Sequence, residues 1–288
     1  MLVVDNIQKL RSIIRPWKNN DVVIGFVPTM GNLHDGHLSL IERAKKESNK
    51  VIASIYVNPL QFDRPDDLTR YPRTLQNDLA LLEQQGVDVV FTPDDKAIYP
   101  DGIEMSTKVD VPVISTILCG AHRPGHFVGV ATVVCKLFNM IEPDLAVFGE
   151  KDFQQLMLVR RMTQDLNMPV KIIGAQTMRE DNGLAMSSRN NYLSDEEKQT
   201  ASTIYKTLCD VAAKLVAGNQ HYPSLEREGR ETLEKAGFIP DYLQILRKTD
   251  LQLPSPEEPL EELVILCAAL LGKARLIDNL QLSSFMAS

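Results

Sequence analysis

Two histidines three residues apart, His34 and His37, are the first groups in this sequence that could do chemistry. Together with Asp35 and Gly36 they form a turn between an apolar stretch, residues 22–27, and an amphipathic one. At a helix start, free backbone N–H groups and the positive dipole end favour a bound anion. The same dipole end disfavours an imidazolium, so we expect His37 to be neutral and to donate a hydrogen bond to a phosphate. Gly36 would let a nucleotide approach the backbone closely.

Two other interpretations of this histidine pair stay open. A strand followed by an amphipathic helix is common, so the two imidazoles could be ordinary surface polar groups. A zinc site is the second alternative. It is disfavoured because the metalloprotease spacing is i, i+4 with a glutamate between, and neither a cysteine nor a third histidine lies nearby.

A second strand end carries groups that suit a nucleotide, at residues 149–152. Lys151 can offer a point charge to a phosphate, and Asp152 can cap the following helix or accept from a ribose. Gln155 lies one turn further along that helix. The segment therefore repeats the geometry expected at His34 and His37.

A third polar segment, residues 178–194, has too few apolar residues for a core element. Within it, Ser187, Ser188 and Arg189 follow Met186 and place two hydroxyls and a guanidinium on consecutive residues. That set can bind the phosphates of ATP and a departing pyrophosphate.

Polar groups that could bind an organic acid follow other apolar segments. Gln61 comes after the apolar stretch 51–57, and its amide can both donate to and accept from a hydroxy acid. Arg123 precedes a predicted helix start and could recognise a carboxylate or a phosphate with its planar guanidinium. Ordinary loop polarity remains the alternative for both residues.

The elements that must position these groups alternate between strands and helices. We predict strands over 22–27, 51–57, 87–91, 144–148 and 170–174, with helices over 6–18, after Asp35 as N-cap, around Leu75–Leu82, from His126 and over 153–166. This order predicts an α/β fold with a parallel sheet. The remainder predicts a smaller α+β part, with helices over 195–217 and 223–236 and strands over 242–246, 263–271 and 274–278.

Composition limits the class of protein. The chain has 288 residues, 44% of them apolar, which is enough for one large or two modest domains; we favour two, over 1–175 and 176–288. The net charge of −7 and the lack of a Lys/Arg run argue against nucleic-acid binding. The four cysteines have no paired spacing, and we find neither a leader pattern nor an apolar run long enough for a membrane. These features predict a cytoplasmic protein.

The histidine turn and the Ser-Ser-Arg loop together resemble the nucleotidylyltransferase superfamily, with its His-x-Gly-His signature and Lys-Met-Ser-Lys-Ser-like loop. The sequences of these and other segments resemble the pantothenate synthetase (pantoate–β-alanine ligase) family more closely still. The matching segments are Pro28-Thr29-Met30-Gly31-Asn32-Leu33-His34-Asp35-Gly36-His37, Val57-Asn58-Pro59-Leu60-Gln61-Phe62, Tyr71-Pro72-Arg73-Thr74, Arg123-Pro124-Gly125-His126-Phe127, Phe148-Gly149-Glu150-Lys151-Asp152, Met186-Ser187-Ser188-Arg189-Asn190 and Arg275-Leu276-Ile277-Asp278-Asn279.

The resemblance implies a Rossmann-like nucleotidyltransferase domain followed by a C-terminal lid, and a two-step reaction. ATP and (R)-pantoate would give pantoyl adenylate and pyrophosphate, and β-alanine would then displace AMP to form pantothenate, or vitamin B5, in the coenzyme A pathway. The implied ATP site contains Met30, Gly31, Asn32, Leu33, His34, Asp35, Gly36, His37, Gly149, Glu150, Lys151, Asp152, Met178, Met186, Ser187, Ser188 and Arg189. The implied catalytic groups are His37 as proton donor with His34, Lys151, Ser187, Ser188 and Arg189; Gln61 and Gln155 would hold pantoate, with Asn58 and Arg123 as neighbours.

The resemblance also implies Mg²⁺ for the first step and a homodimer. The Mg²⁺ ligands stay unknown. Asn77 and Asp78 lie in a region where relatives can be more acidic, and much of the coordination could come from phosphates and water. Two alternative functions stay open. One is a nucleotidyltransferase of the same fold that acts on a phosphorylated acceptor and keeps AMP in its product. The other is a non-catalytic nucleotide-binding module.

Overall fold

The structure is a computed structural model that describes residues 1–62, 65–255 and 257–287. The chain divides into two compact units. The first unit comprises Met1–Glu150 and Gln155–Gln176, and the second unit comprises Lys151–Gln154 and Thr177–Ser288.

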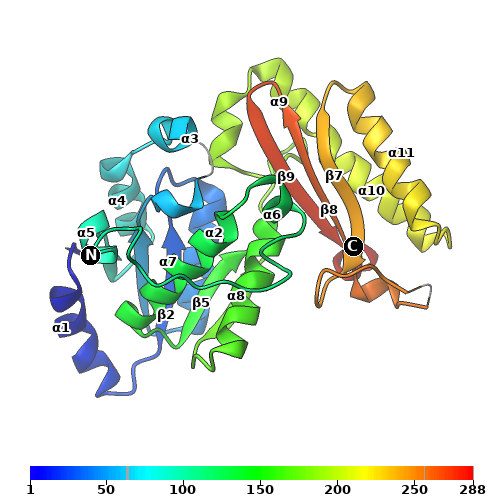
Figure 1. Ribbon diagram of the computed structural model, residues 1–288. Helices are drawn as coiled ribbons and strands as arrows, with labels where there is room; N and C mark the ends of the chain where they lie inside the picture. Colours follow the sequence, from blue (N-terminus) through cyan, green and yellow to red (C-terminus); the bar gives the residue numbers. More distant parts are fainter. Residues whose placement is uncertain (63–64, 256, 288) are drawn as a thin grey trace. The chain divides into compact units, whose positions relative to one another are not determined.

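The first unit is built on a parallel sheet (Figure 1). In the described residues it has six strands in the order β1-β4-β3-β2-β5-β6. Their bounds are β1 (Leu2–Val4), β2 (Ile24–Thr29), β3 (Lys50–Ile55), β4 (Val89–Phe91), β5 (Leu145–Gly149) and β6 (Lys171–Ala175). The chain runs outward from β2 in both directions, so β2 lies at the point where the strand order reverses. Ligands of open α/β sheets bind beyond the carboxyl ends of the strands at such a point.

Helices connect these strands, and both faces of the sheet are apolar. The helices are α1 (Ile7–Lys18), α2 (Asp35–Glu47), α3 (Pro65–Arg70), α4 (Leu75–Gln84), α5 (Asp95–Ile98), α6 (Cys119–His122), α7 (His126–Ile141) and α8 (Phe153–Asp165). One face packs Val27 and Val51 against Ile41 of α2 and Leu82 of α4. Phe26, which precedes Val27 on β2, lies on the opposite face of the sheet. Its ring is edge-on to that of Phe138 of α7, with ring centroids 6.2 Å apart. Alternate side chains of a strand face opposite sides, which explains the near-continuous apolar runs.

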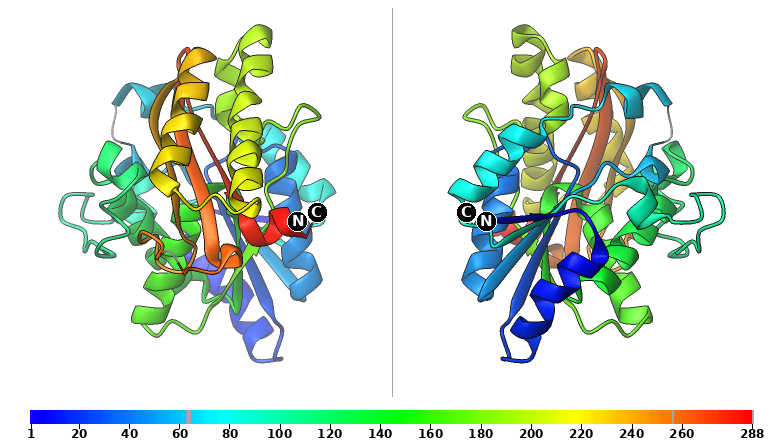
Figure 2. Two further views of the ribbon diagram at one scale, coloured as in Figure 1. Left: turned by 90° about the vertical axis from the view of Figure 1, so that its right-hand side faces the viewer. Right: turned by 90° about the vertical axis from the view of Figure 1, so that its left-hand side faces the viewer.

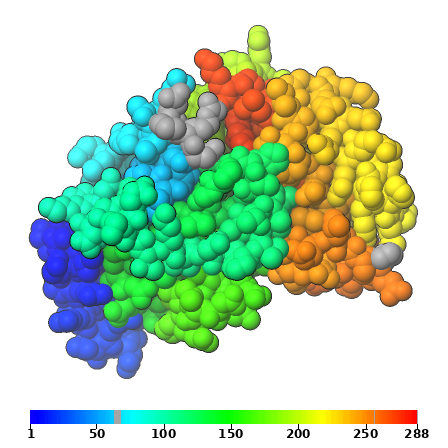
Figure 3. Space-filling model, viewed as in Figure 1, coloured from blue at the N-terminus to red at the C-terminus, as the bar shows by residue number. Residues whose placement is uncertain are grey.

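The second unit contains an antiparallel sheet in the order β7-β8-β9. Its strands are β7 (Ile239–Arg247), β8 (Leu263–Leu271) and β9 (Ala274–Gln281), and its helices are α9 (Asp195–Ala201), α10 (Thr203–Val216), α11 (Tyr222–Lys235) and α12 (Leu282–Met286). Helices α10 and α11 lie side by side against this sheet (Figure 2). Leu208, Leu225 and Ile265 are among the residues of the shared core. The outer side of α11 is exposed (Figure 3, yellow).

The predicted fold class is confirmed, and several local predictions are wrong. His34, not Asp35, is the N-cap of α2, so Asp35 already belongs to the first helical turn. The helix predicted over 195–217 is interrupted at Ser202, which separates α9 from α10. Strand β1 and helix α3 were not predicted. The capping box of Ser194 and Glu197 is present, with both hydrogen bonds formed at 2.8 and 3.1 Å.

Candidate active site

The histidine turn begins directly after β2, where the backbone takes left-handed conformations. Gly31 has φ of 78° and Asn32 has φ of 51°. Glycine and asparagine are the residues that tolerate this region most readily. The Thr29 hydroxyl donates to the Ser54 carbonyl oxygen at 2.8 Å and accepts from the Gly31 N–H at 3.2 Å, so the turn is fixed to β3.

A buried carboxylate holds the next part of the turn. Asp78, which is 1% exposed, accepts from the backbone N–H groups of Asn32 at 3.0 Å and Leu33 at 2.8 Å. The Thr74 hydroxyl donates to the same carboxylate. A Cβ at Gly31 would lie 2.9 Å from Asp78 Oδ2, so the glycine also makes this approach possible. From the sequence, Asp78 is considered only as a residue near a metal ion. The feature that could have indicated its structural role is its place as an acidic residue on the core-facing side of a helix.

His34 and His37 lie against each other. Their ring centroids are 4.1 Å apart, and the His37 Nδ1 accepts from the His34 backbone N–H at 3.4 Å. A ring that accepts at Nδ1 can carry its proton on Nε2 and donate from there. Both rings are half-buried at the start of α2. The pair can therefore present donors beside the free N–H groups of the helix.

Gln61 lies in the short helical turn η1 (Pro59–Gln61) after β3, and it is buried. Its Nε2 donates to the Met30 sulfur at 2.7 Å, and its Oε1 accepts from Asn58 at 3.2 Å. Asn58 is 1% exposed and is held in turn by the Tyr99 hydroxyl, which donates to Asn58 Oδ1 at 2.8 Å. Burial raises the pKa of Tyr99, so this hydroxyl stays a donor at neutral pH. Asn58 thus orients Gln61.

Arg123 and His126 support the backbone of Gln61. Arg123 Nη2 donates to the Gln61 carbonyl oxygen at 3.2 Å, and His126 Nδ1 is 2.7 Å from the same oxygen. Because a carbonyl can only accept, His126 Nδ1 carries a proton; Nε2 then accepts from Arg123 Nη1 at 3.2 Å. Sequence analysis did not assign a role to His126 or Tyr99.

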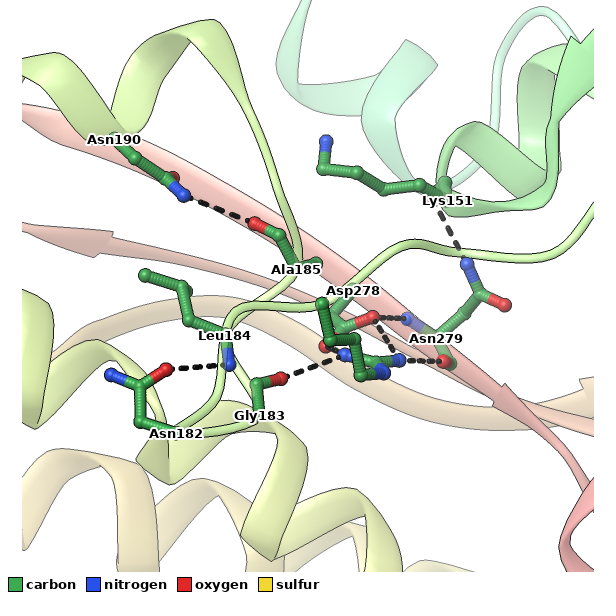
Figure 4. A network of polar contacts seen from close by, with 9 residues as sticks. Lys151, Asn182, Gly183, Leu184, Ala185, Asn190, Asp278 and Asn279 are labelled. Carbon is green, nitrogen blue, oxygen red and sulfur yellow. Dashed lines mark hydrogen bonds and ion pairs between the residues drawn. The ribbon is translucent and has the colours of Figure 1, made fainter. Parts of the chain in front are cut away.

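The groups at the end of β5 lie in and beside the short turn η2 (Glu150–Asp152). Gly149 is the last residue of β5, and Gln155 is half-buried in the first turn of α8. The Lys151 side chain is 18% exposed, with Nζ 3.9 Å from Asp152 Oδ2. Its backbone carbonyl accepts from Asn279 Nδ2 of β9 at 3.0 Å (Figure 4).

Residues 186–189, called the 186–189 loop below, lie in the second unit, and Ser188 and Arg189 also begin the short helical turn η3 (Ser188–Tyr192). Met186 N–H donates to the Met178 carbonyl oxygen at 2.9 Å, and the Ser187 hydroxyl accepts from the Arg189 N–H at 3.2 Å. Ser187, Ser188 and Arg189 are half-buried, and Met178 is 42% exposed.

The predicted site residues therefore fall into two sets. In the first unit, hydrogen bonds join Met30 to Gln61, and Gln61 to Asn58 and Arg123, while His34 and His37 are paired on the same turn as Met30. In the second unit, Lys151 and the segment 178–189 are joined through residues of β9.

The fit of a metal ion can be tested on the side chains. Among residues 1–62, 65–255 and 257–287, no cluster of three or more His, Cys, Asp or Glu could hold one. Asp78, the acidic residue in the region considered for Mg²⁺, accepts hydrogen bonds from backbone N–H groups with both of its carboxylate oxygens. The described side chains thus do not form a Mg²⁺ cage of their own.

Comparison with known proteins gives one consistent result. The model of the pantoate-beta-alanine ligase family matches residues 2–281. A pantothenate synthetase of Idiomarina loihiensis is 53% identical over 274 residues, which cover 95% of this chain and 96% of the relative. One of Thioalkalivibrio sulfidiphilus is 52% identical over 271 residues, 94% of each chain.

Solved structures agree with this result. A pantothenate synthetase of Thermus thermophilus aligns with a TM-score of 0.88 at 43% identity and covers 98% of this chain and 99% of its own. The pantoate-beta-alanine ligase of Francisella tularensis, solved in complex with beta-gamma ATP and beta-alanine, aligns with a TM-score of 0.82 at 38% identity and covers 98% of both chains. In the part of our chain that the structure describes, helices are too short or too polar to cross a bilayer.

Proposed function

The chain belongs to the pantoate-beta-alanine ligase family, and we therefore propose that it joins (R)-pantoate to β-alanine in a reaction that cleaves ATP to AMP and pyrophosphate. A pantoate carboxylate oxygen attacks the α-phosphorus and the bond to the β-phosphate breaks, giving pantoyl adenylate and pyrophosphate. The β-alanine amine then attacks the acyl carbon, loses a proton and displaces AMP, leaving pantothenate. The observation that carries the proposal is the match over residues 2–281, which includes every segment that contributes a site residue.

We assign the α-phosphate to the turn after β2. His37 donates from Nε2 to the phosphate as negative charge grows, with His34 beside it and the N–H groups of α2 behind it. Residues 30–37, with residues 149–152, Met178 and residues 186–189, form the proposed ATP site. The backbone contacts that hold His37 on its turn leave its donor little to reorganise, which favours stabilisation of the transition state.

The departing pyrophosphate is assigned to the second unit. Lys151 offers an ammonium, Ser187 and Ser188 offer hydroxyls, and Arg189 offers a guanidinium that can contact two oxygens at once. Pyrophosphate leaves with a large negative charge, so cations and donors at its oxygens lower the barrier of the adenylation step.

Pantoate is assigned to the amides of Gln61 and Gln155, with Asn58 and Arg123 supporting Gln61 from behind. A glutamine can donate to a carboxylate and accept from a hydroxyl, which fits a hydroxy acid. The contacts from Asn58 and Arg123 fix both ends of Gln61 before substrate arrives.

Mg²⁺ enters this proposal as part of the ATP substrate. The ion would be held chiefly by phosphate oxygens and water, because it dehydrates reluctantly and binds proteins through few groups. The Asp78 carboxylate fits a different role, since it already binds the turn of residues 32–33. A homodimer and a cytoplasmic location complete the proposal. Both rest on the family resemblance.

The proposal is tested by incubating the protein with ATP, pantoate and β-alanine and measuring AMP. We expect AMP and pantothenate to form together only when both acids are present. A nucleotidyltransferase would instead leave AMP attached to its product, which mass spectrometry would detect. A binding module would bind ATP without exchanging pyrophosphate into ATP when pantoate is added.

A further inference from the structure

A buried ion pair joins the base of the 186–189 loop to β9. Arg179 Nη1 lies 2.6 Å from Asp278 Oδ2 and Nη2 lies 3.0 Å from Oδ1, so the contact is bidentate. The two side chains are only 18% and 4% exposed, and the guanidinium lies 3.6 Å from the centre of the Tyr205 ring. Buried pairs of this kind contribute little net stability, because desolvation offsets their attraction. Their geometric precision is the stronger reason to look for a role.

This ion pair holds a hairpin over residues 179–185, and the 186–189 loop follows that hairpin directly. Arg179 forms an antiparallel bridge with Ala185, and its Nη1 also donates to the Gly183 carbonyl oxygen at 3.1 Å. On the far side of the loop, Asn190 Nδ2 donates to the Ala185 carbonyl oxygen at 3.1 Å (Figure 4). The residues just before and just after 186–189 are thus bonded to each other.

The neighbouring residue of β9 holds the other phosphate-binding group. Asn279, which is 5% exposed, donates from Nδ2 to the Lys151 carbonyl oxygen at 3.0 Å. The Asn279 N–H also donates to Asp278 Oδ1 at 2.8 Å, so the two residues are linked. Successive side chains of a strand leave on opposite faces, so two adjacent positions can reach two separate segments.

We propose that Asp278 and Asn279 are positioning residues for adenylation: Asp278, through Arg179, sets the 186–189 loop, and Asn279 sets Lys151. Both proposed pyrophosphate-binding segments then take their position from one strand of a rigid sheet. The inference rests on the function proposed above and adds residues that touch neither ATP nor pantoate. A shift of about 1 Å in a catalytic group can cost ~100-fold in rate.

The consequence is a specific kinetic pattern. Lys151 and the loop are proposed to act on the departing pyrophosphate, which is present only in the first half-reaction. Changing Asp278 or Asn279 should therefore slow pantoate-dependent exchange of pyrophosphate into ATP by roughly 10- to 100-fold. The reaction of supplied pantoyl adenylate with β-alanine should stay near the wild-type rate. The loss should fall mainly on kcat, because the displaced groups act on the transition state.

Asn279→Ala and Asn279→Asp are the main variants. The first removes the whole amide, and the second keeps its shape but replaces the donor with oxygen and adds a negative charge beside Asp278. Asp278→Asn keeps the size of the side chain but removes the charge that pairs with Arg179. If Asp278→Asn fails to fold, the two Asn279 variants still decide the question. Circular dichroism and thermal unfolding establish the folded fraction for each.

The chain offers a matched control on the same strand. Arg275 of β9 forms an ion pair with Asp241 of β7, with Nε and Oδ2 2.7 Å apart. That pair is also partly buried, yet it contacts neither Lys151 nor the hairpin in any bond described above. Asp241→Asn should leave both half-reactions near the wild-type rate.

Two results would overturn the inference. In the first, the Asn279 variants lose both half-reactions in proportion to the folded fraction, which would make the residue purely structural. In the second, the folded variants retain wild-type exchange. Failure of the proposed function looks different, because then the wild-type protein itself shows no pantoate-dependent exchange, and the inference falls with it.

Discussion

The imidazole of His37 is oriented by the residue that begins its own helix. The backbone N–H of His34 occupies Nδ1 at 3.4 Å, so the proton lies on Nε2. Asp78 in turn binds the two N–H groups just before His34. The contact within the turn thus favours the His37 tautomer with its proton on Nε2. The contact from Asp78, which is distant in sequence, fixes the position of the turn.

Replacing His37 with alanine should separate catalysis from folding. Loss of a preorganised phosphate donor typically costs about 100- to 1000-fold in rate. The free energy of unfolding should stay within roughly 1 kcal/mol of wild type, since the ring is only half-buried. Pantoate-dependent pyrophosphate exchange and chemical denaturation measure the two quantities.

His221 supplies the opposite control. Its Nδ1 accepts from the Ser224 N–H at 3.2 Å and caps α11 in the second unit. His221→Ala should lower stability by about 1 kcal/mol, as loss of a cap usually does, with exchange unchanged. If His37→Ala behaved like His221→Ala, with activity following only the folded fraction, the proposed role of His37 would be wrong.

At the residue scale, sequence reasoning found groups whose chemistry is local. His34 with His37, and Ser187 with Ser188, are close in sequence, and their type is informative by itself. The sequence did not predict the residues that hold these groups in place from distant parts of the chain. Asp78 contacts a backbone N–H 46 residues away, and no local pattern encodes such a contact.

The contact between α7 and the turn η1 is the element-scale feature on which Gln61 depends. At Gly129 of α7 the helix approaches η1 so closely that a Cβ would lie 2.3 Å from the Leu60 carbonyl oxygen. Asn58 Nδ2 donates to the Gly129 carbonyl oxygen at 3.0 Å at the same place. The backbone of α7 therefore contacts η1 directly and helps to fix Asn58, which orients Gln61.

Gly129→Ala should displace η1 and weaken pantoate binding. Overpacking of this kind typically costs ~1–3 kcal/mol of stability, and here the atom that must move is backbone. We expect KM for pantoate to rise more than KM for ATP, measured by exchange at varied substrate. Gly229→Ala in α11 is the matched control, because its Cβ would meet the end of the Leu243 side chain, at 2.8 Å, in the core of the second unit rather than η1. An unchanged KM for pantoate in Gly129→Ala would contradict the assignment.

Element type was predictable wherever apolar spacing extended over several turns or a whole strand. The helices containing Leu79 and Val133, strands β2 to β6 of the first sheet and the three strands of the second sheet follow from such spacing. Strand β1 was missed because three residues are too few to show a period, and only pairing with β4 defines it. The break at Ser202 interrupts a continuous helical pattern, so the pattern alone predicted one helix.

At the scale of the whole molecule, the proposed adenylation step uses groups from both units. The first unit supplies His37 and the second unit supplies Lys151. Each unit has its own sheet and its own core. A variant in one unit can therefore keep the core of that unit and still remove a donor that the proposed step needs.

A double-mutant cycle tests whether the two units act in one chemical step. His37→Ala and Lys151→Ala should each slow pyrophosphate exchange by about 100-fold, and the double variant should lose clearly less than the product of the two losses, because groups that act as a unit are non-additive. Lys214→Ala is the control, since its side chain is 51% exposed and pairs only with Glu228 in the contacts described for it. Combined with His37→Ala, it should add nothing. If the losses of His37→Ala and Lys151→Ala multiplied in full, the two groups would contribute independently, and the proposal that they act as one coupled unit would be wrong.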